Sequence, residues 1–99
     1  MAMIDLTVIL TAKDLNCVPE LRELLAMQVN LSRLEPGCVR FEAFESQTLA
    51  GTFILIERWA SQAALDVHRT AEGFTTIYAP RVLPLVNRTA HVCHVLAGI

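Results

Sequence analysis

The segment Thr52–Trp59 restricts the fold more than any other, because it reads as a strand with two apolar faces. Alternation puts Phe53, Leu55, Glu57 and Trp59 on one face and Thr52, Ile54, Ile56 and Arg58 on the other. Residues 38–46 alternate in the same way, and the turn-like residues 47–51 join the two runs into a predicted antiparallel hairpin. Such a sheet must be covered on both sides. Helices can cover one side, and in a short chain a partner's sheet is the natural cover for the other.

The segments before this hairpin predict a strand and a helix. Residues 3–11 alternate, with Ile4, Leu6, Val8 and Leu10 on one face. Asn16 stands before Pro19 and Glu20, an arrangement typical of a helix start. The helix is expected to reach about residue 34, where Pro36 and Gly37 stop it.

The segments after the hairpin predict further helix and a final strand. Ser61 is a good N-cap for a helix over residues 62–70, which places Ala64, Leu65 and His68 on one face. A second helical pattern covers residues 74–85, where Pro80 and Pro84 predict a kink or two short pieces. Residues 89–96 alternate as the last strand.

The element order β-α-β-β-α-(α)-β predicts a single domain over residues 1–99, a ferredoxin-like α+β sandwich with a four-stranded antiparallel sheet. A domain of 99 residues buries only about 60 to 65% of the surface of its unfolded chain. The hydrophobic fraction of 54% exceeds what such a core needs. We therefore expect a homodimer, most simply one with two-fold symmetry.

Charge and patterning exclude several classes of partner. The net charge is −2 and no basic cluster exists, so nucleic acid and anionic membranes are not expected to bind. No apolar run approaches the roughly 20 residues of a membrane helix. The first residues lack the features of a secretory signal, so a cytoplasmic protein is expected. Three widely spaced cysteines, Cys17, Cys38 and Cys93, fit reduced side chains rather than a disulfide framework.

Three groups of residues occur together in a known pattern: the run Glu35-Pro36-Gly37-Cys38-Val39-Arg40-Phe41, the spaced set Glu57, Trp59, Ser61, Ala64, Leu65 and His68, and then Gly73, Phe74 and Tyr78. In this order they resemble the antibiotic biosynthesis monooxygenase family over nearly the whole chain. The resemblance implies a dimeric α+β barrel, in which two four-stranded sheets meet face to face with the helices outside. It also implies a ligand cavity between each sheet and its own helices.

The resemblance implies a choice of activities. The leading one is a cofactor-independent monooxygenase that oxidises a small hydroxylated aromatic or quinol with O₂. The family also includes an isomerase that processes an autoinducer, so proton shuttling on a small oxidised metabolite is an alternative. A non-catalytic protein that binds an apolar small molecule is a third reading, since the aliphatic residues leave few polar groups for a pocket.

The resemblance assigns roles to particular residues, and each also has a packing explanation. Trp59, Phe74 and Phe41 would be walls of the cavity, or core residues. His68 would be the base that takes a phenolic proton, or a structural histidine on an apolar helix face. Tyr78 would donate a hydrogen bond to a substrate oxygen, or pack with Phe74 on one helical stripe.

Arg40 is a further candidate for binding a substrate oxygen. It would face Glu57 if paired residues of the hairpin sum to 97, and a cross-strand ion pair is then the simpler explanation.

No cofactor and no metal are expected. His91 and Cys93 point to one side of a strand and His94 to the other, so the three cannot converge on one ion. Haem-degrading relatives have a Trp at the position of His68 and a haem-ligating His at that of Tyr78, so the resemblance disfavours haem.

Overall fold

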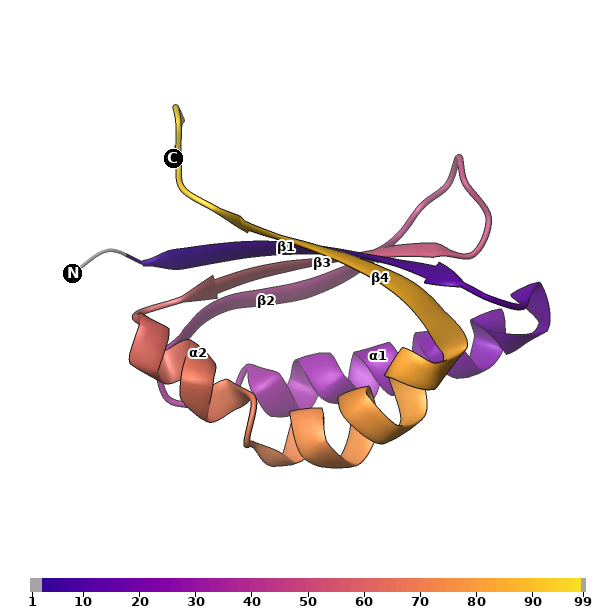
Figure 1. Ribbon diagram of the computed structural model, residues 1–99, viewed down its shortest axis with the longest axis horizontal. Coiled ribbons are helices and arrows are strands. Elements are labelled where there is room, and N and C mark those ends of the chain that lie inside the picture. Colours follow the sequence, from indigo (N-terminus) through magenta and orange to yellow (C-terminus); the bar gives the residue numbers. More distant parts are fainter. Residues whose placement is uncertain (1–2, 99) are drawn as a thin grey trace.

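Four antiparallel strands and a helical layer on one of their faces make up the structure, a computed structural model that describes residues 3–98 (Figure 1). In chain order the elements are β1 (Ile4–Ala12), the 3₁₀ turn η1 (Leu15–Cys17), α1 (Val18–Ser32), β2 (Cys38–Glu45), β3 (Thr52–Trp59), α2 (Gln62–His68), the π-helix η2 (Gly73–Val82), the 3₁₀ turn η3 (Leu83–Leu85) and β4 (Val86–Cys93). The strand order is β2-β3-β1-β4. The fold is therefore the ferredoxin-like α+β sandwich that the sequence predicted.

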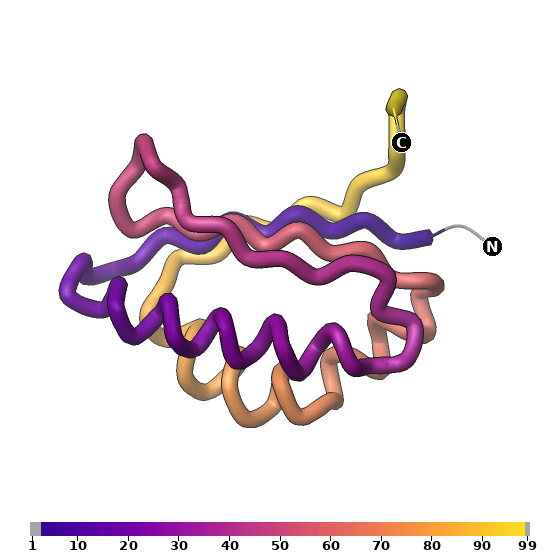
Figure 2. The backbone as a smooth tube through the Cα atoms, turned by 180° about the vertical axis from the view of Figure 1, so that it is seen from behind, coloured from indigo at the N-terminus to yellow at the C-terminus, as the bar shows by residue number. Residues whose placement is uncertain are grey.

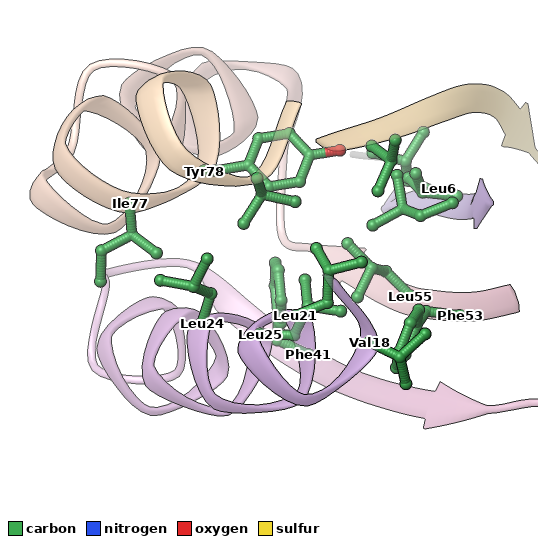
Figure 3. Close-up of a cluster of buried hydrophobic side chains, with 14 of the residues drawn as sticks. Leu6, Val18, Leu21, Leu24, Leu25, Phe41, Phe53, Leu55, Ile77 and Tyr78 are labelled. Carbon is green, nitrogen blue, oxygen red and sulfur yellow. The ribbon is translucent and has the colours of Figure 1, made fainter. Parts of the chain in front are cut away.

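The core lies between the sheet and the helices. Leu6, Val8 and Leu10 of β1 alternate inward, and the α1 residues Leu21, Leu24 and Leu25 meet them from the helical layer (Figure 3). Along the layer α1 lies under β2, and η2 lies beside α1 under β4 (Figures 1 and 2). Trp59 and Phe41 are fully buried in the same core. The alternation predicted for β1 and β3 is confirmed, and the structure shows that the face of β3 with Glu57 and Trp59 is the buried one.

The first helix begins differently from the prediction. Asn16 lies inside the turn η1, and the Asp14 side chain accepts the backbone N–H of Asn16 instead. The helix α1 follows without a side-chain cap and has Pro19 in its first turn, where the missing N–H has no helical partner to lose. The predicted cap residue was wrong because Asp14 forms the local side-chain turn two residues earlier.

The second half agrees with the expected helices and departs from the prediction at the last strand. As predicted, the helical stretch with Pro80 and Pro84 forms two pieces, the π-helix η2 and the 3₁₀ turn η3. Pro80 has no N–H to donate, and the wider turn of a π-helix accommodates its ring. Strand β4 starts at Val86, three residues before the predicted start, because η3 ends at Leu85 and Val86 pairs at once with Ala12.

The expected pairing of Arg40 with Glu57 is wrong. A β-bulge between Cys38 and Arg40 shifts the register by one residue, so Arg40 lies opposite Arg58 and Phe41 lies opposite Glu57. Arg40 forms its ion pair with Glu42 at 2.7 Å instead. The bulge therefore sends Arg40 to the face of the sheet away from the helices and keeps Phe41 on the buried face.

Within residues 3–98, no helix or strand lies over the face of the sheet opposite the helices (Figure 1). Alternation along the paired strands puts several apolar side chains on this face. This open face includes Thr7, Ile9, Phe44, Ile54 and Ile56, together with the Asp5–Arg58 ion pair at 2.6 Å. Within residues 3–98, none of the helices has the length and apolar character needed to cross a membrane.

Candidate active site

Polar and aromatic side chains from both layers meet around a small cavity between the sheet and the helices. Its lining includes Gln28 of α1, Glu57 of β3, His68 of α2, Phe74 and Tyr78 of η2, and Arg88 of β4. The cavity measures about 20 Å³, enough for about one water molecule. Gln28 is buried and its Oε1 has no hydrogen-bond partner in the described part of the chain. That oxygen can accept a hydrogen bond from a molecule in the cavity.

His68 is held at the end of α2 by two neighbours. The helix starts at Ser61, whose side chain accepts the backbone N–H of Ala64. One helical face then carries His68 inward, where it is only 4% exposed. Its Nδ1 lies 2.8 Å from Oε1 of Glu35, and its ring lies against Trp59 with 4.4 Å between centroids.

The Glu35 contact determines what the imidazole can do. Burial lowers the pKa of His68 below its ordinary value of 6.5, although the hydrogen bond and the charge of Glu35 oppose the shift. The ring is therefore neutral at pH 7. Since Nδ1–H is the donor that a carboxylate requires, Nε2 carries the lone pair, a tautomer we assign from the hydrogen bond. Nε2 is then able to act as a base.

Aromatic rings form a continuous series through the site. Phe41 meets Trp59 edge-on at 6.2 Å between centroids, and it lies 5.7 Å from His68. Phe74 also lies 5.7 Å from His68, on an edge-to-face contact, and 5.3 Å from Tyr78. Five of the six candidate residues from the sequence are therefore brought together.

Tyr78 and Arg88 lie at the side of the cavity formed by η2 and β4. The Tyr78 ring extends from η2 toward Leu6 of β1 (Figure 3). Its hydroxyl accepts a hydrogen bond from Nε of Arg88 at 2.8 Å, and the guanidinium lies 5.9 Å from the ring centroid. Burial raises the pKa of Tyr78 above 10.0, although Arg88 opposes this. Tyr78 is thus a neutral phenol that can donate its own proton to another acceptor.

Glu57 is the residue that sequence reasoning missed. Its carboxyl is 4% exposed, and Oε1 accepts the Nε1–H of Trp59 at 3.0 Å. Burial raises the pKa of Glu57 to about 7, against the hydrogen bond from Trp59 and the charges of Arg88 and Arg69. Alternation along β3 had already put Glu57 on the same face as Trp59, and that signal could have identified it.

Arg40 lies apart from this cluster. It is half exposed on the other face of the sheet, and its partner is Glu42. A larger open groove of about 360 Å³ runs between α1 and β2, lined largely by apolar side chains such as Leu25, Val29 and Phe44. It contains none of the candidate residues. We place the candidate active site at the small cavity because the titratable groups with shifted pKa values meet there.

Metal-ligating side chains do not converge anywhere in residues 3–98: no group of three among His, Cys, Asp and Glu could hold an ion. Cys17, Cys38 and Cys93 are unpaired.

The sequence pattern of antibiotic biosynthesis monooxygenases matches residues 17–79, a span that includes Glu35, Glu57, Trp59, His68, Phe74 and Tyr78. The chain belongs to the antibiotic biosynthesis monooxygenase family. The match begins in η1 and ends in η2, so it covers α1, the hairpin and α2. The resemblance to this family, which was based on the Glu-Pro-Gly-Cys run and the spacing from Trp59 to His68, is therefore confirmed.

Individual relatives agree with this assignment. Rv0793 of Mycobacterium tuberculosis is 35% identical over 72 residues, which cover 73% of this chain and 69% of Rv0793. Its structure superposes with a TM-score of 0.87 over 98% of both chains, at 25% identity. The Synechocystis protein sll1783 is 43% identical over 37 residues, and the chain spans only 25% of that protein.

One enzyme shares the fold at low identity. SnoaB, a cofactor-independent oxygenase from Streptomyces nogalater, has a TM-score of 0.85 and 14% identity, and the match covers 100% of this chain and 98% of SnoaB. At that identity the likeness concerns the fold of the family alone.

Proposed function

We propose that this protein is a cofactor-independent monooxygenase that oxidises a small hydroxylated aromatic or quinol with O₂. The observation that carries the proposal is His68, whose Nδ1 is bound by Glu35 and which lines one cavity together with Phe74 and Tyr78. Membership of the family supports it, as does the relative Rv0793, which is provisionally named a monooxygenase.

Proton removal is the step that the site is built to perform. A neutral His68 takes the proton of a substrate hydroxyl through Nε2, while Glu35 stabilises the imidazolium that forms. The resulting anion is electron-rich and can transfer an electron to O₂. Phe74 lines the cavity and would flank the flat ring of the substrate, while Trp59 and Phe41 support the His68 ring against which they pack. Tyr78 would donate a hydrogen bond to one of the substrate oxygens.

The cavity must widen to admit an aromatic substrate. Ligand pockets are commonly about 300 Å³ or more, against about 20 Å³ here. Arg69 and Arg88 are the exposed residues among those that line the cavity. Release of Arg88 from the Tyr78 hydroxyl would open this side and leave both polar groups free for substrate oxygens.

A homodimer is part of the proposal. The open face of the sheet carries Ile9, Ile54 and Ile56, which an equivalent face of a second copy would cover. The two cavities lie on the helix side of each sheet, so each copy would keep a complete site.

Oxygen uptake tests the function. Wild-type protein in metal-free buffer should consume O₂ with a member of a panel of quinols and anthrones, and His68→Ala should lower kcat by about 10²-fold or more. His94→Ala is the matched control, because His94 is exposed and lies after the end of β4. Wild-type turnover no higher than the buffer background, or an undiminished rate in His68→Ala, would refute the proposal.

Isomerisation of a small oxidised metabolite is the second candidate. Two proton-carrying groups, His68 and Glu57, share the cavity, and such a pair suits the removal of a proton at one carbon and its return at the next. An isomerase needs no O₂. Conversion of substrate under anaerobic conditions would favour it over the oxygenase.

A further inference from the structure

We propose that Glu57 is the proton donor of the site: its carboxyl gives a proton to the oxygen that O₂ adds to the substrate. This inference rests on the proposed function and adds a second catalytic residue on the wall of the cavity formed by the sheet. His68 is the base from the helical layer, and Glu57 is the acid from β3.

The position of Glu57 fixes the direction of its carboxyl. In the sheet Glu57 lies between Leu6 of β1 and Phe41 of β2, so neither of its cross-strand neighbours is charged. Trp59, two residues along the same strand, binds Oε1 from the side. Oε2 has no hydrogen bond within residues 3–98, while the residue lines the cavity. Oε2 is therefore the atom that can carry a proton to a bound molecule.

Charged groups face Glu57 from every element around it. Arg88 of β4 and Arg69, just after α2, favour the carboxylate, whereas Glu35 from the turn after α1 favours the acid. His68 and Tyr78 also line the cavity, and both are neutral at pH 7. Burial outweighs the two arginines, and the pKa of about 7 leaves a large share of Glu57 protonated at neutral pH.

The two groups complete a balanced reaction on a substrate with an activated CH₂, such as an anthrone. His68 takes one proton, and the anion gives one electron to O₂. The two radicals join through a new C–O bond to form a peroxide anion. Glu57 protonates its outer oxygen, and the Glu57 carboxylate then takes the second C–H proton. The electron pair of this C–H bond becomes the second bond of C=O as the O–O bond breaks. The hydroxide that leaves takes the proton from His68 and becomes water. CH₂ and O₂ become C=O and water, and both residues return to their starting states.

The pH dependence of turnover tests this role. The active form needs a neutral His68 and a protonated Glu57, so kcat for an anthrone should fall as the pH rises through about 7. In Glu57→Gln we expect kcat to be about 10²-fold lower, with no such fall in the remaining rate. Glu57→Asp keeps an ionisable carboxyl and should keep the fall. Glu23→Gln is the matched control, since Glu23 is exposed on α1 and does not line the cavity.

A readout without substrate accompanies the kinetics. Trp59 is the only tryptophan and donates to Glu57, so its fluorescence should change as the carboxyl titrates near pH 7. Glu57→Gln should lack this transition. Trp59 in Glu57→Gln should keep the emission of a buried tryptophan, which would show that the variant is folded.

The outcomes separate the two proposals. If the wild type turns over and Glu57→Gln has the same kcat and the same fall with rising pH, the role of Glu57 is wrong but the proposed function stands. A wild-type emission profile without a transition near pH 7 would do the same. A complete lack of wild-type turnover would overturn the proposed function, and the role of Glu57 with it.

Discussion

A buried carboxyl beside a tryptophan is the most informative feature at the scale of single residues. Glu57 lies among the buried residues Leu6, Phe41 and Trp59, surroundings that disfavour its charged form. Keeping an ionisable group there lowers stability at neutral pH, a pattern typical of functional sites. His68 differs, since Glu35 offsets part of its desolvation.

Stability should depend on pH through Glu57. Its folded pKa of about 7 is raised above the ordinary 4.5, so its contribution is fully present below pH 4.5 and is lost as the pH rises through 7. A pKa difference of this size between the folded and unfolded states corresponds to about 3 kcal/mol in the free energy of unfolding. Glu57→Gln should therefore gain about 3 kcal/mol in free energy of unfolding relative to the wild type between pH 4.5 and pH 8. Urea denaturation at several pH values measures this, and a pH-independent difference would contradict it.

At the scale of elements, the turn between α1 and β2 brings the two halves of the site together. Gly37 has φ of +83°, and a Cβ there would lie 2.5 Å from Cβ of Ala64 in α2. The backbone N–H of Ala60 donates to the Gly37 carbonyl at 2.8 Å. Because Gly37 has no side chain, the turn packs directly against α2. This packing brings Glu35 within hydrogen-bond distance of His68.

Gly37→Ala should lower the free energy of unfolding by about 2 kcal/mol or more, because positive φ alone costs an L-residue about 1–2 kcal/mol and the contact with Ala64 adds to it. Ala64→Gly removes the clash but not the backbone strain. The double variant should thus be less destabilised than the sum of the two single variants. Thermal or urea unfolding of all four proteins completes the cycle, and strict additivity would show that the contact is not the cause.

At the scale of the whole molecule, the sheet is covered on one side only. The helices of residues 3–98 all lie on the same face (Figure 1). The open face has apolar side chains from β1, β2 and β3, and none of the elements described in residues 3–98 covers them. A second copy placed face to face would bury both open faces at once.

Light scattering should give a mass near twice 11.0 kDa at micromolar concentration. Ile56→Lys puts a charge at the centre of the open face and should shift the mass toward that of one chain. Met27→Lys introduces the same charge on an exposed position of α1 and should leave the mass unchanged. A wild-type mass of 11.0 kDa would rule out the proposed dimer.

The sequence by itself determined the order of the elements, the alternation of β1 and β3, the helical face that carries His68, and the Ser61 cap. These depend on residues close in the chain: alternation, helical spacing and one side-chain hydrogen bond. Of the six candidate residues that it named, five gather at the site, although their grouping there came through resemblance to the family.

Only the tertiary structure decided the register of β2, the pairing of Glu35 with His68 and the surroundings of Glu57. The bulge depends on how two strands fit together, and Glu35 and His68 are 33 residues apart. The protonation of Glu57 depends on burial beneath three helical segments and on arginines that follow it in the chain. Contacts between distant segments set these features, so local sequence patterns could not reveal them.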